Sequence, residues 1–461
     1  MPKPSTLISD AFGTLVVRMI GIALMFVSTT VSARLLGPAE YGAYTAALAL
    51  AILLATLAPM GSDRILVRSL STAKCLSERG RETAIAHLCT AITAVILLCA
   101  ALVSWVINDQ ILDNHSLART SLLAAFMFVP QSVTYLRQWV AIPLIGARRA
   151  VMPEQTLVPV LFMAAILFVA GTGFRVTALT ASTSYFVVLL LVWAGSVGVG
   201  SLRATYRSAW NTFPQIRQLP VRARILEGIP FVSVAIGAVW TQTCTPLIIA
   251  MTCGFDDTAC YALAMPYAAL PAIPLSVFNL IMIPRCARYF RNREFAEANH
   301  AVRSAATVTF VLAAVIGGSV WICSPWLITV LGKQYSMTCR LLPPLLLAAL
   351  VDCLTGPTIP VMQTMSLEKT YTRTLFAFIP IHLGLIYFFS RVAGIEGAAL
   401  GYLLSRCVWN VVVVTRIYQL RRLVMLPYLS FQSAFTEESR QSPDEPSEDR
   451  PKQGLLSAFT F

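Results

Sequence analysis

Four arginines lie inside long apolar segments or at their ends, where a charged side chain is unexpected. They are Arg18, Arg34, Arg137 and Arg406. A guanidinium group is planar and donates two parallel hydrogen bonds, which matches the oxygens of a phosphate or diphosphate. Arg18, Arg34 and Arg137 lie close enough to a membrane surface to snorkel, so anchoring of helix ends is the alternative interpretation. Arg406 lies too deep to snorkel, and its alternative is a structural ion pair.

Two further ionisable residues lie within apolar segments, Asp352 and His382. Both are candidates for proton or cation coupling, although His382 can instead serve as a polar contact between helices. Asp352 and Arg406 lie at a similar depth, roughly 15–17 Å from the outer ends of their segments at about 1.5 Å per residue. A lone charge there costs at least about 2.5–3.5 kcal/mol. We therefore predict that Asp352 and Arg406 pair in one conformational state.

The composition indicates a polytopic membrane protein. The chain is 57% hydrophobic and 12% charged, and its mean hydropathy is +0.70, whereas soluble domains carry roughly 25% charged residues. A net charge of +13 would suggest nucleic-acid binding in a soluble protein. Here most Lys and Arg residues lie in short connections between apolar segments, where they orient a protein in the lipid bilayer. Nucleic acid is therefore not expected as a partner.

The apolar pattern predicts an all-α protein with about twelve transmembrane helices. The segments are 14–36, 42–60, 83–107, 120–145, 155–172, 178–200, 228–253, 258–284, 304–331, 341–363, 374–390 and 396–418. Alternate connections, on the side of the N-terminus, hold nearly all Lys and Arg, which predicts that both termini are cytoplasmic. We divide the chain into a six-helix bundle (1–200), a cytoplasmic connection (201–227), a second six-helix bundle (228–420) and a largely disordered cytoplasmic tail (421–461).

A polar corner between the first two segments recurs in the second half of the chain. The corner runs from Ala33 to Tyr44, and we expect Gly37-Pro38 and Gly42 to end its two helices. At a constant offset and without a gap, Gly37 matches Gly254. The other matched pairs are Ala33 with Ala250, Glu40 with Asp257, Gly42 with Ala259, Tyr44 with Tyr261, Ala47 with Ala264 and Arg68 with Arg285. The corner therefore indicates two bundles related by an internal repeat.

The corner, Ala33-Arg34-Leu35-Leu36-Gly37-Pro38 followed by Tyr41-Gly42, resembles the opening of the polysaccharide or O-antigen lipid flippases. These belong to the multidrug/oligosaccharidyl-lipid/polysaccharide exporter superfamily. Leu66-Val67-Arg68 and the six-plus-six layout extend the resemblance over most of the chain. The family motif carries over to Arg34, Gly37, Tyr41 and Arg68 only.

The resemblance implies a V-shaped flippase of the bacterial inner membrane. Such a protein moves a polyprenyl-diphosphate-linked oligosaccharide repeat unit to the periplasmic leaflet by alternating access, for O-antigen, capsule or exopolysaccharide synthesis. A polysaccharide polymerase and a chain-length regulator are candidate partners. A diphosphate with sugars cannot cross hydrocarbon bare, so we expect a water-filled cavity lined by the four arginines.

Other chemistry is not indicated. The four His and eleven Cys residues have no metal-ligand spacing, and no phosphate-cradling Gly-rich loop occurs, so neither a metal nor another cofactor is expected. Glu227 is interpreted as the cap of the seventh segment, and a Cys253–Cys260 disulfide is a minor alternative to free thiols. Two rival functions stay open: an exporter of drugs or metabolites, which would need cavity carboxylates, and a membrane polysaccharide polymerase or ligase. We expect a transporter rather than an enzyme.

Overall fold

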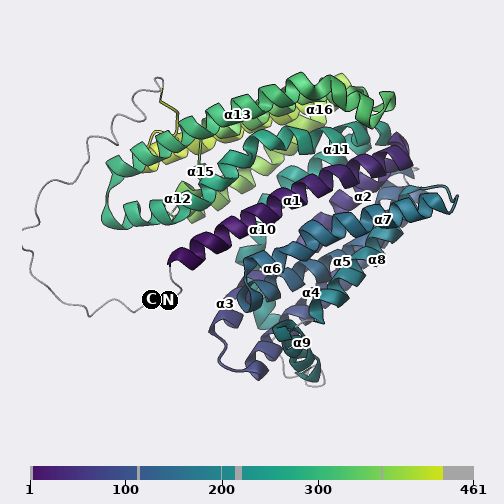
Figure 1. The fold of residues 1–461 in the computed structure, drawn as a ribbon, viewed down its shortest axis with the longest axis horizontal. Coiled ribbons are helices and arrows are strands. Elements are labelled where there is room, and N and C mark those ends of the chain that lie inside the picture. The colour runs from purple at the N-terminus through teal and green to yellow at the C-terminus, as the bar shows by residue number, and fades with distance from the viewer. Residues whose placement is uncertain (1–3, 112–114, 199, 213–220, 365–366, 429–461) are drawn as a thin grey trace, which may run out of the picture.

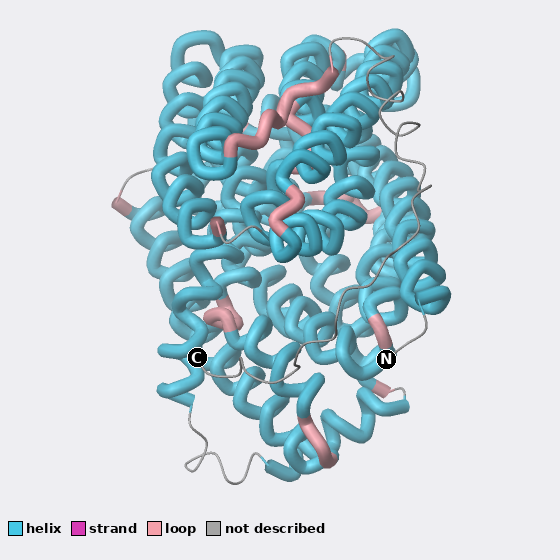
Figure 2. The backbone as a smooth tube through the Cα atoms, turned by 90° about the vertical axis from the view of Figure 1, so that its left-hand side faces the viewer, coloured by secondary structure: helices cyan, strands magenta, loops and turns pink. Residues whose placement is uncertain are grey.

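The computed structural model describes residues 4–111, 115–198, 200–212, 221–364 and 367–428. Within these ranges the chain forms helices joined by short turns, and no strand occurs (Figure 2). The helices of the first half are α1 (Pro4–Leu36), α2 (Pro38–Leu57), α3 (Ser62–Thr72), α4 (Leu76–Gln110), α5 (His115–Ile145), α6 (Ala147–Met152), the π-helix η1 (Pro153–Leu157), α7 (Val158–Gly171), α8 (Ala178–Val197) and α9 (Gly200–Thr212). Those of the second half are α10 (Val221–Thr252), α11 (Phe255–Ala269), η3 (Leu270–Ala272), α12 (Ile273–Asn292), α13 (Phe295–Leu331), η4 (Lys333–Tyr335), α14 (Met337–Leu354), α15 (Thr358–Thr364) and α16 (Glu368–Arg421).

The prediction of about twelve membrane helices is confirmed. Nine stretches of the described chain are long and apolar enough to cross a bilayer. Helices α5 and α10, with 31 and 32 residues, supply two more crossings. The twelfth comes from α16, which is two helices divided by non-helical backbone at Ala393 and Gly394. The chain is a multi-pass membrane protein.

The two corners adopt the same local structure, as the repeat predicts. Gly37 and Gly254 each precede a helix with a positive φ, of 77° and 95°. Glycine adopts this backbone conformation without the steric cost that a Cβ brings. The expected position of the turn was wrong in one respect, because α2 begins at Pro38 and Gly42 lies inside it. Proline is well suited to the first position of a helix, so Gly37 alone makes the turn.

The two halves meet at the end of the molecule that carries these corners, which we name the corner end. Here α2 packs against α11, and a Cβ added to Gly42 would lie 1.8 Å from the carbonyl oxygen of Phe255. Only a glycine allows this approach. At the opposite end, which carries α3, α9 and the arginine-rich connections and which we name the basic end, the two groups of helices diverge on either side of α1 and α10 (Figure 1). The molecule is therefore V-shaped.

Two segment boundaries differ from those expected at the basic end. Helix α10 begins at Val221, so Glu227 lies within a helix and is not its cap. The segment after α16 is partly packed: Leu423 and Met425 are buried, and the Val424 amide donates to the Asn299 side chain. Leu423 and Met425 belong to the apolar core of the second bundle, which explains why this short segment is ordered. Residues 429–461 lie outside the described part of the chain.

Candidate functional site

A cavity of about 630 Å³ lies between the two halves of the molecule. It is bounded by α1, α2, η1, α7 and α8 from the first half and by α10, α11, η3 and α12 from the second. Its wall is mainly apolar and aromatic, with a few hydroxyls. Tyr44, Phe162 and Tyr185 form one aromatic group, in which the Tyr44 and Phe162 rings stack at 5.5 Å between centroids. A cavity shared by both halves changes its shape whenever the halves move relative to each other.

Among the described residues that line this cavity, Glu154 is the only charged one. It lies in η1, directly after Pro153, where the helix from α6 to α7 widens into a π-helical turn. The Glu154 carboxylate accepts hydrogen bonds from Arg137 of α5, at 2.5 Å from Nη2 and 3.2 Å from Nε. Arg137 also donates to the Ala150 carbonyl oxygen at 2.7 Å. The carboxylate therefore stands between the arginine and the cavity.

Arg137 itself is 0% exposed and does not line the cavity. One atom on each side of this pair, Arg137 Nη1 and Glu154 Oε2, is buried without a hydrogen-bond partner in the described structure. A buried charge is tolerated when it is paired, which explains the pair. In this conformation Arg137 is a partner of Glu154, and its contact with cargo stays a prediction.

The predicted pairing of Asp352 with Arg406 is present. Arg406 of α16 donates from Nη2 to Asp352 Oδ2 at 2.6 Å and from Nε to both carboxylate oxygens at 3.1 Å. Asn410, one turn further along α16, donates to Asp352 Oδ1 at 2.7 Å, and the Thr355 hydroxyl lies 2.6 Å from Asn410 Oδ1. Both charged side chains are 20% exposed. The second half thus contains its own polar cluster between α14 and α16.

His382 lies in the first part of α16, and its partner is not a member of this cluster. Its ring is buried, and Nδ1 lies 2.8 Å from the hydroxyl of Ser405. The same hydroxyl lies within hydrogen-bond distance of the Tyr402 carbonyl oxygen, at 2.7 Å. His382 therefore links the two parts of α16. A coupling role for His382 stays a prediction.

Arg34 takes part in the closure of the corner end. Its Nη2 donates to the Thr329 carbonyl oxygen near the end of α13, at 3.0 Å. Beside it, the buried Tyr335 hydroxyl donates to the Ala33 carbonyl oxygen at 2.6 Å. Both bonds join the first half to the second. Any opening at this end must break them.

The remaining predicted residues lie in the cavity wall, at the corners or at the basic end. Tyr41 is buried in the cavity wall, whereas Gly37 and Gly254 form the corners. Arg68 in α3 and Arg285 in α12 are exposed at the basic end. The side chain of Arg18 lies outside the described structure. Neither Arg34 nor Arg406 lines the cavity, so the expected set of arginines is not gathered around it in this conformation.

Three residues of these contacts were not predicted from the sequence: Glu154, Asn410 and Tyr335. Glu154 follows a proline at the edge of a predicted segment, where a carboxylate is usually taken for an interfacial residue. Its one sequence signal was the proline, since a proline inside a helix removes a backbone hydrogen bond and favours a local distortion. Asn410 lies four residues after Arg406, a spacing that places both on one helix face.

Comparisons with known proteins agree with this architecture. Residues 7–290 match the family model described as "Polysaccharide biosynthesis protein". No curated protein matches the chain. A solved structure described as the inward-facing conformation of a multidrug resistance MATE family transporter of the MOP superfamily has a TM-score of 0.70 at 15% identity, covering 90% of this chain and 99% of that one.

Two further solved structures show the same fold. The lipid II flippase MurJ in an inward closed conformation has a TM-score of 0.63 at 13% identity and covers 95% of this chain and 94% of its own. An outward-facing MATE family transporter has a TM-score of 0.50 at 14% identity, covering 90% and 96%. This chain therefore has the fold of these transporters and of this flippase.

Proposed function

Because this chain belongs to the polysaccharide biosynthesis protein family, within the fold of the MOP superfamily of flippases and exporters, we propose that it moves a polyprenyl-diphosphate-linked oligosaccharide repeat unit across the bacterial inner membrane. The observation that carries the proposal is the cavity between two halves that touch at the corner end, while at the basic end the helices on either side of α1 and α10 diverge. A glycan needs such a cavity because it cannot cross hydrocarbon bare, while the polyprenyl chain stays in the lipid.

The basic end is assigned to the cytoplasm, because Lys and Arg concentrate in cytoplasmic connections. Both termini are then cytoplasmic, and the described conformation accepts cargo from the cytoplasmic side. Opening toward the periplasm separates Arg34 from Thr329 and Tyr335 from Ala33. Once its bond to Thr329 is broken, the Arg34 guanidinium is available to a diphosphate at the outer leaflet.

The Asp352–Arg406 pair is proposed to couple cargo or protons to the second bundle. Protonation of Asp352 neutralises its carboxylate, and a diphosphate at Arg406 competes with that carboxylate for the guanidinium. Either event weakens the ion pair. The α14–α16 contact loosens as a result. His382 is a second candidate for this coupling, through Ser405 next to Arg406.

One observation favours a second candidate function. Among the described residues of the cavity wall, the charged one is Glu154, whose carboxylate would attract cationic cargo and repel a diphosphate. An exporter of cationic drugs or metabolites is therefore the alternative. In a flippase, the same carboxylate would accept hydrogen bonds from sugar hydroxyls while the diphosphate stays near the membrane surface.

The deciding experiment compares cells with and without this protein. Polyprenyl-diphosphate-linked repeat units should accumulate in cells that lack it, and spheroplasts should hold them on the cytoplasmic leaflet, inaccessible to a glycosidase added outside. Normal levels of these intermediates together with increased sensitivity to cationic dyes would instead establish the exporter.

Association with a polymerase and a chain-length regulator is part of the proposal, and cross-linking in membranes tests it.

A further inference from the structure

Helix α9 presents two arginines on one exposed face. It contains Arg203 and Arg207 and no acidic residue, while Leu202, Thr205 and Ala209 are buried on its other face. Their spacing of four residues separates the two arginines by about 6 Å along the helix axis. Within the described structure neither of them forms an ion pair or a hydrogen bond. Two adjacent cations without a protein anion are suited to an external one.

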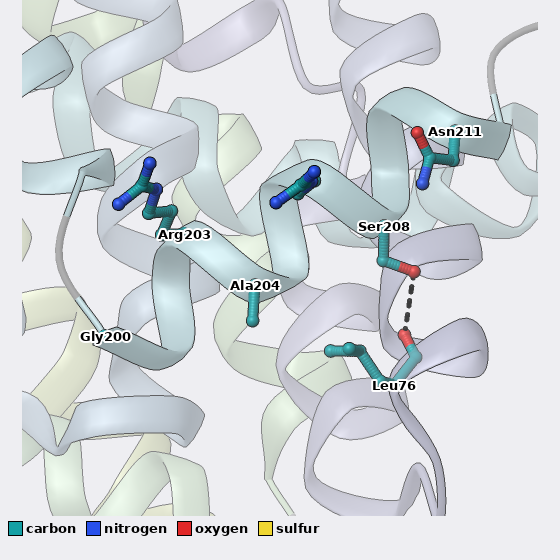
Figure 3. Close-up of a pocket in the computed structure, with 7 residues that line it drawn as sticks. Leu76, Gly200, Arg203, Ala204, Ser208 and Asn211 are labelled. Carbon is teal, nitrogen blue, oxygen red and sulfur yellow. Dashed lines mark hydrogen bonds between the residues drawn. The ribbon is translucent and has the colours of Figure 1, made fainter.

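A hollow lies on each side of these arginines. The first, of about 560 Å³, is lined by one face of α9 and by Leu76 at the start of α4 (Figure 3). The second, of about 540 Å³, lies against the last turns of α8, where Trp193, Ala194 and Val197 supply an apolar wall. Arg203 and Arg207 line both hollows. Apolar surface beside two guanidinium groups is the environment that a lipid headgroup and its glycerol require.

The hollows are held in place by close packing of α9 on α4. The Ser208 hydroxyl donates to the Leu76 carbonyl oxygen at 3.1 Å, as Figure 3 shows. A Cβ added to Gly80 would lie 2.2 Å from the Ser208 hydroxyl oxygen, so the two helices touch at this glycine. The site is therefore built before any ligand arrives.

The position of α9 places it at the membrane surface. Only two residues separate the end of α8, which crosses the membrane, from the start of α9. Trp193 lies in the last turns of α8, and Trp210 of α9 is 75% exposed. Tryptophan side chains are enriched at the level of lipid headgroups.

We propose that α9 binds the anionic phosphate of a lipid headgroup at the basic-end surface of the membrane. Arg203 and Arg207 donate hydrogen bonds to the phosphate oxygens, and the wall formed by Trp193 and Val197 contacts the apolar part of the lipid. The ligand class includes bulk anionic phospholipids and polyprenyl phosphates. This site is separate from the cavity, and it does not depend on the identity of the cargo.

The test uses the purified full-length protein in phosphatidylcholine nanodiscs with an increasing fraction of phosphatidylglycerol. Lipid retained by the protein is counted by native mass spectrometry, and the melting temperature is recorded alongside. Arg203→Ala/Arg207→Ala should lower apparent affinity roughly 30-fold, taking about 1 kcal/mol for each arginine near an anionic surface. The effect should shrink as salt is raised.

The matched control is Arg148→Ala/Arg149→Ala, which removes two exposed arginines from α6. It should bind lipid like the unaltered protein. A parallel series uses undecaprenyl phosphate in place of phosphatidylglycerol. If the protein retains only one of these two lipids, and if this retention depends on Arg203 and Arg207, that lipid is the ligand. The proposal is overturned if neither lipid is retained in preference to phosphatidylcholine, or if the α6 and α9 variants lose equal affinity.

Discussion

Arg406 holds Asp352 through both carboxylate oxygens, and Asn410 on the same helix completes the contact at 2.7 Å. The three side chains join α14 to the last part of α16 within the membrane. Such a pair is costly to bury but more costly to break, because removal of one partner leaves the other charge uncompensated.

A double-mutant cycle on this pair is the first prediction. Asp352→Asn and Arg406→Gln should each reduce export at least about tenfold and lower protein level, since breaking a buried pair costs about 3–5 kcal/mol. The double variant should recover part of the protein level. Quantitative immunoblotting and polymer export are the measurements. Strictly additive effects would contradict energetic coupling between the two residues.

The second prediction concerns Glu154 and Arg137. Glu154→Gln leaves Arg137 fully buried without a countercharge, so the melting temperature of the purified protein should fall. Glu154→Gln/Arg137→Met, which removes both charges, should melt at a higher temperature than Glu154→Gln. A thermal melt followed by size-exclusion chromatography measures this. If the double variant melts at a lower temperature than Glu154→Gln, the unpaired charge of Arg137 does not explain the lower melting temperature of Glu154→Gln.

Cationic cargo provides a separate readout for the same carboxylate. If Glu154 binds a cation in the cavity, Glu154→Gln/Arg137→Met should abolish dye efflux by the overexpressed protein. In a flippase, this variant should instead alter polymer export and leave dye sensitivity unchanged.

The third prediction is that Gly42→Ala opens the corner end. An added Cβ would lie 1.8 Å from the Phe255 carbonyl oxygen, so α2 and α11 must separate. A cysteine at Ser32, in the cavity wall, should then react faster with a charged thiol reagent added from the periplasm, with the parent protein as the measure of background labelling. The control is Gly318→Ala in α13, where a Cβ meets nothing within 4 Å. Equal labelling of the two variants would show that the Gly42 contact does not close this end.

The fourth prediction is topological. Reporter fusions after Arg224, Arg293 and Arg422 should report cytoplasm, and fusions at Asp113, Asp256 and Tyr335 should report periplasm. The reason is the concentration of Lys and Arg at the basic end. Paired alkaline phosphatase and green fluorescent protein fusions give opposite signals at each site. A periplasmic signal after Arg293 would reverse the assignment of the two ends.

Several features could be predicted from the sequence because the bilayer imposes them on each segment separately. The twelve crossings follow from apolar length, and the corners follow from the glycines at Gly37 and Gly254, which permit a positive φ. The Asp352–Arg406 pair was predictable as well, since two opposite charges at one depth have few other partners in hydrocarbon.

Contacts between segments were decided by the tertiary structure. Depth does not determine which face of a helix points inward, so Arg137 was expected in the cavity, whereas the structure buries it behind Glu154. The sequence predicts a turn at Gly42, because a glycine in an apolar segment gives no sign of what approaches it. Only the packing of α2 on α11 shows that the Phe255 carbonyl does. Hydropathy records the preference of each residue for lipid or water, while the lateral partners of a helix depend on how all the other helices pack around it.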